Sequence, residues 1–253
     1  MLHSYEKILN RWFTSVLGHA LLVAEKHWLA KHLPLMTGNV ALQIGVTTDW
    51  LEASPIKKRF ILFEEGVTLG PEDGVQVDFR ALPLTPSSID FMLVTHIMEG
   101  LPNPQSFLEE IYQALAPDGK LVIFSLNPYS LWGIQRVIDK NAKLPSGIEF
   151  CSPWQIKHWL HACGYRVIIS ESLFFRPLVN NQAALSNLLW MEAVGSFLYP
   201  GLGAVSVILA EKVEEGMTPL KLVDWLKKIF IRVECSEPSA GVSGYHNDSK
   251  KNQ

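Results

Sequence analysis

Apolar residues recur along this chain in two alternating patterns, short unbroken runs and helical steps of three and four residues. A short apolar run bounded by turn residues is typical of a strand buried on both faces of a parallel sheet. Seven runs, the third of them alternating in polarity, predict strands at residues 40–44, 59–63, 75–79, 89–96, 120–126, 165–170 and 204–211.

Apolar residues at helical spacing fill most of the intervals and predict helices there. Their ranges are 5–33, 104–115, 131–138, 153–163 and 180–197. Gly18-His19 predicts a break in the first of them. Asn103-Pro104 and Ser152-Pro153-Trp154-Gln155 predict sharp helix starts, because a polar cap precedes a proline at the first helical position. Asp49-Trp50-Leu51-Glu52 has the same capping spacing and predicts a short helix, which Pro55 ends early.

The alternation of strands and helices, without internal repeats, predicts one doubly wound α/β domain with a mostly parallel sheet. We expect the apolar 89–96 strand in the interior of that sheet. The predicted organisation is a helical leader at 1–38, the α/β domain at 39–212 with a helical insertion at about 173–203, an amphipathic segment at 213–233, and a polar tail at 234–253 that is expected to be disordered.

The composition narrows the classes of partner. The 253 residues are 48% hydrophobic and carry a net charge of −3, which argues against a nucleic-acid-binding surface. Cys151, Cys163 and Cys235 have no paired spacing, so neither a disulfide framework nor a metal site is expected. No apolar run reaches the ~20 residues that span a bilayer, and no signal peptide is recognisable. These features predict a cytoplasmic protein, with at most weak membrane-surface contact through 218–233.

The stretch from residue 40 to residue 65 has the order of a nucleotide-binding α/β unit: strand, tight turn, short crossover, second strand and terminal acid. The terminal acid, Glu64, can accept hydrogen bonds from a ribose diol, whereas Glu65 is expected to point away. The turn keeps a single glycine, Gly45, so this pattern is weakly specific on its own.

A longer ordered set of motifs runs through the centre of the chain. It reads DFRALPL from Asp78, SIDFMLVTHIME from Ser88, LPNP from Leu101 and ALAPDGKLVI from Ala114. This order resembles the small-molecule branch of the class I S-adenosylmethionine-dependent methyltransferases, of the type 11-like kind. The resemblance covers about residues 35–209, and the segments 127–133 and 152–164 are similar to a bacterial subgroup of it. It implies a seven-stranded sheet in which the 204–211 strand is antiparallel near one edge.

The resemblance also implies roles for particular residues. Gln43, Gly45 and Asp49 stand where the family turn meets the methionine part of S-adenosylmethionine, and Glu64 stands where the ribose is bound. Further implied contacts are Asp78 and Phe79 with adenine, His96 with cofactor or acceptor and as the candidate base, and Tyr129, Trp132 and Trp190 with a small or lipid-like acceptor. Each of these residues also has a plainer interpretation as a turn former, a helix cap, a loop histidine or a packing residue.

The first turn departs from the family pattern, which has an acid followed by three spaced glycines. Gln43, Gly45, Thr47 and Asp49 occupy those places. A β-branched residue is unsuited to a left-handed turn, so the loop at Thr47 must take another path or hold strain. One hypothesis is that the carboxylate of Asp49 replaces the missing acid. A non-catalytic binding or scaffolding protein is the main alternative function. A nicotinamide-dependent oxidoreductase is disfavoured, because the glycine-rich turn and a Tyr-x-x-x-Lys donor are missing.

Overall fold

The computed structural model describes residues 2–64, 74–138 and 149–213, which lie in one compact unit that ends at Glu214. The predicted segments beyond Val213, together with Glu65 and Cys235, lie outside the described residues. Within the described ranges, no helix is both long enough and apolar enough to cross a membrane.

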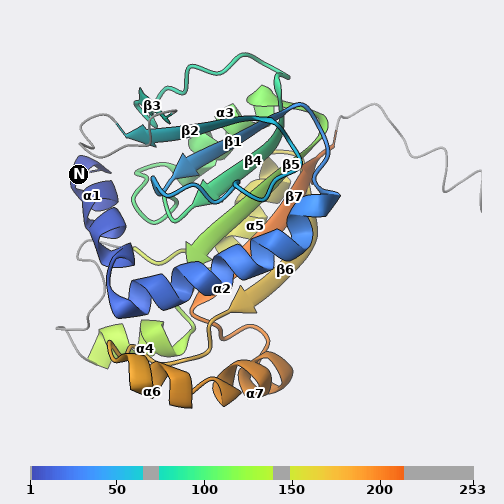
Figure 1. Ribbon diagram of the computed structural model, residues 1–253. Helices are drawn as coiled ribbons and strands as arrows, with labels where there is room; N and C mark the ends of the chain where they lie inside the picture. Colours follow the sequence, from blue (N-terminus) through green and yellow to red (C-terminus); the bar gives the residue numbers. More distant parts are fainter. Residues whose placement is uncertain (1, 65–73, 139–148, 214–253) are drawn as a thin grey trace, which may run out of the picture. The chain divides into compact units, whose positions relative to one another are not determined.

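A seven-stranded sheet forms the centre of this unit, in the order β3-β2-β1-β4-β5-β7-β6 (Figure 1). The strands are β1 Val40–Gly45, β2 Lys58–Glu64, β3 Gly74–Val77, β4 Ile89–Thr95, β5 Leu115–Leu126, β6 Tyr165–Leu173 and β7 Val205–Lys212. β7 is antiparallel to both of its neighbours, and the other pairings are parallel. The predicted fold class is therefore confirmed, as are the interior place of β4 and the antiparallel β7 one position from the edge.

Helices cover both faces of the sheet. On one face, α1 (Leu2–Phe13) and α2 (Val16–His32) contribute Phe13, Leu21 and Leu29 to a core with Phe91 and Phe124. On the other face, α3 (Pro104–Ala114) and α5 (Pro153–Ala162) pack on β4 and β5. Figure 1 shows α2 crossing in front of the sheet and α5 behind it, with α4 (Leu131–Ile138), α6 (Gln182–Asn187) and α7 (Trp190–Leu198) gathered beyond one end.

The predicted helix starts at α3 and α5 are confirmed at atomic level. The Asn103 side chain accepts a hydrogen bond from the Ser106 amide at 3.3 Å. Ser152 and Gln155 form the reciprocal capping box in which each side chain bonds the other residue's backbone. Gly164 has φ +90° and supplies the left-handed stop after α5.

The leader forms two helices as predicted, but the break does not lie at Gly18-His19, because α1 ends at Phe13 and Ser15 caps α2. The Ser15 hydroxyl accepts from the Gly18 amide at 3.1 Å. Gly18 lies inside α2, and a Cβ there would lie 2.3 Å from the Trp12 carbonyl oxygen. The glycine therefore permits close approach of the two helices and does not interrupt either of them. The predicted helix at 180–197 is also two helices, α6 and α7.

Candidate functional site

The candidate site lies at the carboxyl ends of β1 and β4, where the strand order reverses direction. From β1 the sheet continues outward through β2 and β3, and from β4 it continues the other way through β5. Ligands of open α/β sheets bind outside the carboxyl ends of the strands at such a switch point. The predicted residues Gln43, Gly45, Glu64 and His96 lie at the ends of β1, β2 and β4. Helix α1 lies along the same edge, beside the arrowheads in Figure 1.

Gln43 organises the loop that follows β1. Its side chain is fully buried, and its Nε2 donates to the carbonyl oxygens of Val46 at 2.6 Å and Thr48 at 2.7 Å. Its Oε1 accepts from the Trp50 amide at 2.9 Å. Both ends of the amide are thus used by backbone groups, which an acid could not do because it has no donor when ionised. The neutral residue at the place of the family acid shapes the loop itself.

The backbone at Gly45 and Thr47 shows why the loop after β1 needs only one glycine. Gly45 has φ +117°, and a Cβ there would lie 2.3 Å from the Thr95 carbonyl oxygen, so β4 requires this glycine. Thr47 is not among the described residues with positive φ. Its amide donates to Asn10 Oδ1 on α1 at 3.1 Å. The loop therefore takes another path, and left-handed strain at Thr47 is avoided.

The prediction of a short helix after Asp49 is wrong, because no helix lies between β1 and β2. Asp49 Oδ1 instead accepts from the Leu51 amide at 2.7 Å, which closes a local turn. The Trp50 amide is held by Gln43, and the Trp50 and Leu51 side chains are buried. The link between β1 and β2 consists of turns and bends, with the Ser54 amide donating to the Leu51 carbonyl oxygen at 2.8 Å, so the site has no helix N-terminus behind the β1 loop.

Helix α1 places an acid against the acid that ends β2. Glu6 Oε2 accepts a hydrogen bond from the Glu64 amide at 2.7 Å, and both side chains are 1% exposed. Burial raises the pKa of Glu6 to about 8; the Glu64 amide bond opposes this rise and the Glu64 charge adds to it. At neutral pH Glu6 is therefore mostly protonated in this arrangement. The Tyr5 hydroxyl donates to the His96 carbonyl oxygen at 2.8 Å and fixes a second point of α1.

His96 is the centre of a buried charged cluster. The residue has φ +54°, its Nε2 lies 2.8 Å from Glu25 Oε1 on α2, and its Nδ1 lies 3.7 Å from Glu99 Oε1. Burial lowers the pKa of His96, but the two carboxylates outweigh it and raise that pKa to about 10. Burial also raises the pKa of Glu25, and the His96 charge opposes that rise. The imidazole is thus a cation held between two acids.

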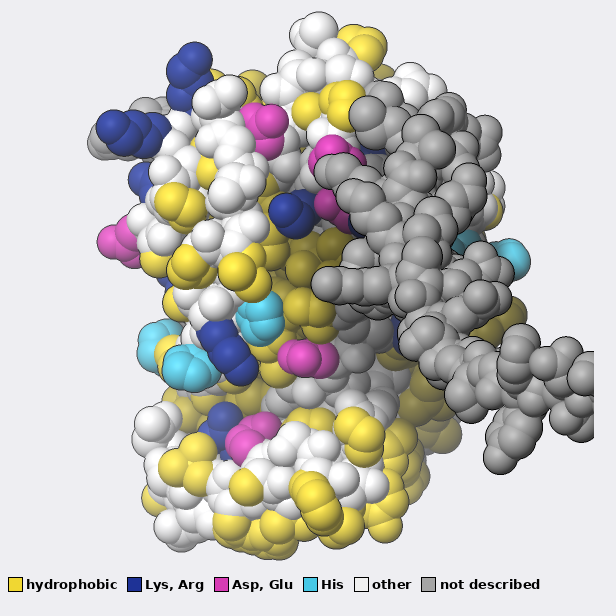
Figure 2. Space-filling model, turned by 90° about the vertical axis from the view of Figure 1, so that its right-hand side faces the viewer, with side chains coloured by type: hydrophobic (Ala, Val, Ile, Leu, Met, Phe, Trp, Pro, Cys, Tyr) yellow, Lys and Arg dark blue, Asp and Glu magenta, His cyan; other side chains and the backbone are white. Residues whose placement is uncertain are grey.

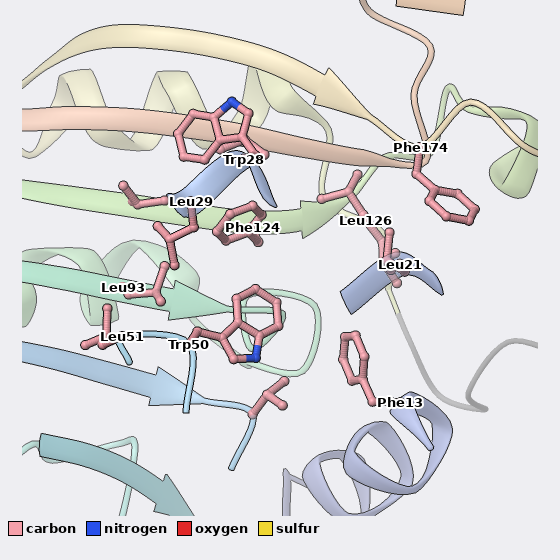
Figure 3. Packing of buried hydrophobic residues seen from close by; sticks show 14 of the residues in the cluster. Phe13, Leu21, Trp28, Leu29, Trp50, Leu51, Leu93, Phe124, Leu126 and Phe174 are labelled. Carbon is pink, nitrogen blue, oxygen red and sulfur yellow. The ribbon is translucent and has the colours of Figure 1, made fainter. Parts of the chain in front are cut away.

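Aromatic side chains lie beside this cluster, and Figure 3 shows three of them, Phe13, Trp50 and Phe124. The Trp50 ring contacts Phe13 of α1 at a centroid distance of 6.2 Å and Phe124 of β5 at 5.4 Å. The Phe13 ring also lies 5.5 Å from the His96 ring. Several buried polar atoms here have no hydrogen-bond partner among the described residues: Glu6 Oε1, Asn10 Nδ2, Glu25 Oε2, Trp50 Nε1, His96 Nδ1 and Glu99 Oε2.

The other predicted residues are not brought to one place. Asp78 accepts from the Arg80 amide at 2.9 Å in a turn, and Phe79 is buried on the α3 face of the sheet. Trp132 is fully buried and donates through Nε1 to the Arg176 carbonyl oxygen at 2.8 Å. Tyr129 and Trp190 are 62% and 59% exposed. Their assignment to cofactor or acceptor stays a prediction.

The sequence interpretation missed Glu6, Asn10, Glu25 and Glu99. One of them left a readable signal, because Glu25 stands four residues after Leu21 and three before Trp28 on the inward stripe of α2. A charged residue at an apolar position of a helix indicates a buried partner elsewhere. That partner, His96, is far away in sequence and only the fold brings it close.

The comparisons with known proteins agree with this architecture. A family model described as a methyltransferase domain matches residues 63–123, which run from the end of β2 into β5. An S-adenosylmethionine-dependent methyltransferase structure from Thermotoga maritima superposes with a TM-score of 0.56 over 84% of this chain and 99% of its own, at 19% identity. The chain has the fold of the class I S-adenosylmethionine-dependent methyltransferases.

Two known proteins are similar to this chain in sequence. The uncharacterized protein YafS of Escherichia coli (strain K12) is 25% identical over 82% of this chain and 74% of its own length. A ubiquinone biosynthesis O-methyltransferase of Xanthomonas euvesicatoria is 26% identical over 46% of this chain. The matched region spans 54% of the Xanthomonas protein.

Proposed function

We propose that this protein is an S-adenosylmethionine-dependent methyltransferase that acts on a small or lipid-like acceptor. The observation that carries the proposal is the buried carboxylate of Glu64 at the carboxyl end of β2, beside the switch point and inside the region that matches the methyltransferase domain. An acid at this place suits the ribose hydroxyls of a nucleoside cofactor. The Xanthomonas relative, by its name, supports a lipid-like acceptor.

The side chains at the carboxyl ends of β1, β2 and β4 suit the cofactor. In this structure, however, α1 occupies the space that the cofactor would fill. Glu64 would hold the ribose, and Asp78 and Phe79 would meet adenine. The amides of Val46, Thr47, Trp50 and Glu64 all donate to side chains of this chain. Binding therefore requires that α1 withdraws, so that Glu6 leaves Glu64 and Asn10 leaves Thr47. The bound cofactor would supply a methyl group already activated on a sulfonium.

His96 has a positioning role in this proposal. A base must be unprotonated, whereas the acids beside His96 raise its pKa to about 10. Protonated His96 instead ties α2 to the loop after β4 through Glu25. It becomes a base only in a form in which α1 and the flanking acids have moved. Tyr129 and Trp190 keep exposed aromatic surface for an apolar acceptor, while Trp132 is enclosed by Trp12 and Phe174.

Isothermal titration of the full chain with S-adenosylmethionine tests the proposal. Glu64→Gln is expected to weaken binding by about 1–3 kcal/mol, the usual cost of losing hydrogen bonds to a charged acceptor. Glu109→Gln, on the exposed surface of α3, is the matched control and should leave affinity unchanged. Equal affinity of Glu64→Gln and the parent protein would contradict the role of Glu64.

A variant that weakens the attachment of α1 distinguishes two possible roles of this helix. In one role α1 covers the binding site, and in the other it forms part of that site. Tyr5→Phe removes the hydroxyl that donates to the His96 carbonyl oxygen and leaves the ring in place. If α1 competes with the cofactor, affinity rises, because the competent form is more populated. Lower affinity would mean that α1 contributes contacts to the ligand.

A non-catalytic binding protein is the second candidate function. It is favoured by the use of all four amides named above in contacts within the chain. In that case neither the parent protein nor Tyr5→Phe gives a titration signal with S-adenosylmethionine, and both remain folded by circular dichroism. A signal from either protein would reject this second candidate.

A further inference from the structure

The helix α7 and its flanks expose a continuous series of large apolar side chains. We call this set the α7 surface; its members are Leu189, Trp190, Val194, Phe197, Leu198, Tyr199 and Leu202. Phe197 is 84% exposed, and no residue of α7 is buried. Figure 2 shows hydrophobic side chains gathered over the lower end of the molecule, where Figure 1 places α7. A patch of this kind marks a site of interaction.

The side of α7 that carries Gly195 and Glu192 packs against the rest of the protein. A Cβ on Gly195 would lie 2.4 Å from the Phe175 ring, so that side of α7 packs closely on the residues after β6. Glu192 also faces inward, where it accepts from the Phe175 amide at 3.1 Å and pairs with Arg176 at 2.8 Å. Trp190, Val194 and Phe197 are spaced so that they share the opposite, outward side.

The outward side carries no charge. From Pro177 to Ala210 the sequence holds a single charged residue, Glu192, and that residue is the one paired with Arg176. A specific protein interface has about one hydrogen bond per 100–200 Å², and within the α7 surface as defined above the polar side-chain groups are the indole of Trp190 and the hydroxyl of Tyr199. Trp, Tyr, Phe and Leu on one face of a helix are the residues that enter the interfacial layer of a bilayer.

We propose that the α7 surface binds a lipid bilayer by inserting into its interfacial layer. The apolar side chains enter the acyl boundary, and Trp190 and Tyr199 lie at the level of the headgroups. Because the outward side lacks cations, attachment depends on buried apolar area and not on anionic lipid. The C-terminal residues 218–233, with Lys221, Lys227 and Lys228, would by contrast bind anionic lipid and release it in salt.

Co-sedimentation of the full chain with phosphatidylcholine vesicles tests this proposal. We expect binding that is unchanged by added salt and by replacing part of the lipid with phosphatidylglycerol. Phe197→Ser and Trp190→Ser should each lower the partition coefficient by about tenfold, from the loss of one inserted aromatic side chain. Phe60→Ser is the matched control, because Phe60 is a 44% exposed aromatic on β2, at the other end of the sheet from α7.

Three outcomes would overturn the proposal. The first is no binding to neutral vesicles, or binding only to anionic vesicles that salt abolishes. The second is an equal loss of binding in Phe60→Ser. The third is a concentration-dependent dimer in sedimentation velocity that Phe197→Ser abolishes, without lipid binding by the parent protein; this result would assign the surface to a second copy of the chain.

Discussion

The edge beneath α1 and the α7 surface depart from the ordinary distribution of side chains in opposite directions. The first buries Glu6, Glu25, Glu64, His96 and Glu99, each at most 3% exposed. The second leaves a row of large apolar side chains on the surface. A buried polar group and a large exposed apolar patch are the two informative exceptions to hydrophobic burial. Each of these regions lowers the free energy of unfolding, and the physical reason is different in each.

Beneath α1 the cost is desolvation, and it is offset within the chain. His96 compensates Glu25, and the Glu6 carboxyl is neutralised by a raised pKa. A buried ion pair is weak evidence for added stability, since an apolar replacement often does as well. On the α7 surface the cost is exposed hydrocarbon, and nothing among the described residues covers it. In the first region charge is offset within the chain, although several polar atoms have no partner among the described residues, whereas the apolar side chains of the second region stay exposed.

The largest effect is expected from removing the central cation. His96→Leu leaves Glu25 and Glu99 buried without their counter-charge, and should lower the free energy of unfolding by about 3–5 kcal/mol at neutral pH. Urea unfolding followed by circular dichroism measures this. His161→Leu, on the exposed end of α5, is the control and should change little. The double variant Glu25→Gln/His96→Gln should recover part of the loss; no recovery would mean that charge is not the cause.

A smaller effect is expected from Glu6. Its pKa is about 8 in the folded protein against 4.5 for an unperturbed glutamate, so the folded state holds more protons between these values. Its contribution to stability is therefore full below pH 4.5 and falls as pH rises to 8. Glu6→Gln keeps an acceptor for the Glu64 amide and cannot ionise. It should be more stable than the parent protein at pH 8 by about 2–3 kcal/mol.

Urea titrations at several pH values, with hydrogen exchange of the α1 amides, test this dependence. The difference between Glu6→Gln and the parent protein should vanish at pH 4.5 and grow steadily toward pH 8. A difference that does not vary with pH would show that Glu6 is ionised throughout. It would also remove the protonation step from the account of how α1 covers the edge.

Elements defined by local chemistry were predictable from the sequence. The cap of Asn103 and the box of Ser152 and Gln155 lie within four residues of the groups that they bond, and both were predicted. The missing helix after Asp49 was not predictable, because the side chain of Gln43, seven residues earlier on β1, accepts from the Trp50 amide. The Gly18 prediction failed for a related reason: a close contact with Trp12 uses the glycine, and no turn does.

The location of the candidate site could be predicted from the sequence, but the contacts that α1 makes there could not. The family resemblance assigned Gln43, Glu64 and His96 to one site, and the structure places them at the ends of β1, β2 and β4, along one edge of the sheet. That α1 covers this edge depends on Glu6 meeting the Glu64 amide, a contact across 58 residues. Separate apolar stripes do not specify such contacts, because a stripe fixes which side of a helix is buried but not which strand end it meets.

A substitution of Asp49 tests whether its carboxylate, in the loop after β1, replaces the acid of the family pattern. Asparagine can accept from the Leu51 amide as aspartate does, so Asp49→Asn should leave the urea midpoint unchanged. Affinity for S-adenosylmethionine should fall several-fold if this carboxylate meets the cofactor's ammonium in place of the family acid. Unchanged affinity in titration would reject the replacement and leave Asp49 with its turn alone.

The smallest effect is expected on the α7 surface. Phe197→Ser should change the free energy of unfolding by less than about 0.5 kcal/mol, because an exposed side chain away from caps and special backbone makes little difference. Phe13→Ala, which removes an aromatic ring that is 4% exposed, should cost about 3–5 kcal/mol in the same urea assay. The contrast matters more than either value. If Phe197→Ser destabilised the protein nearly as much as Phe13→Ala, the ring would be packed inside the folded chain in solution. The α7 surface would then be unavailable to a bilayer, and the opposition between the two regions would fail.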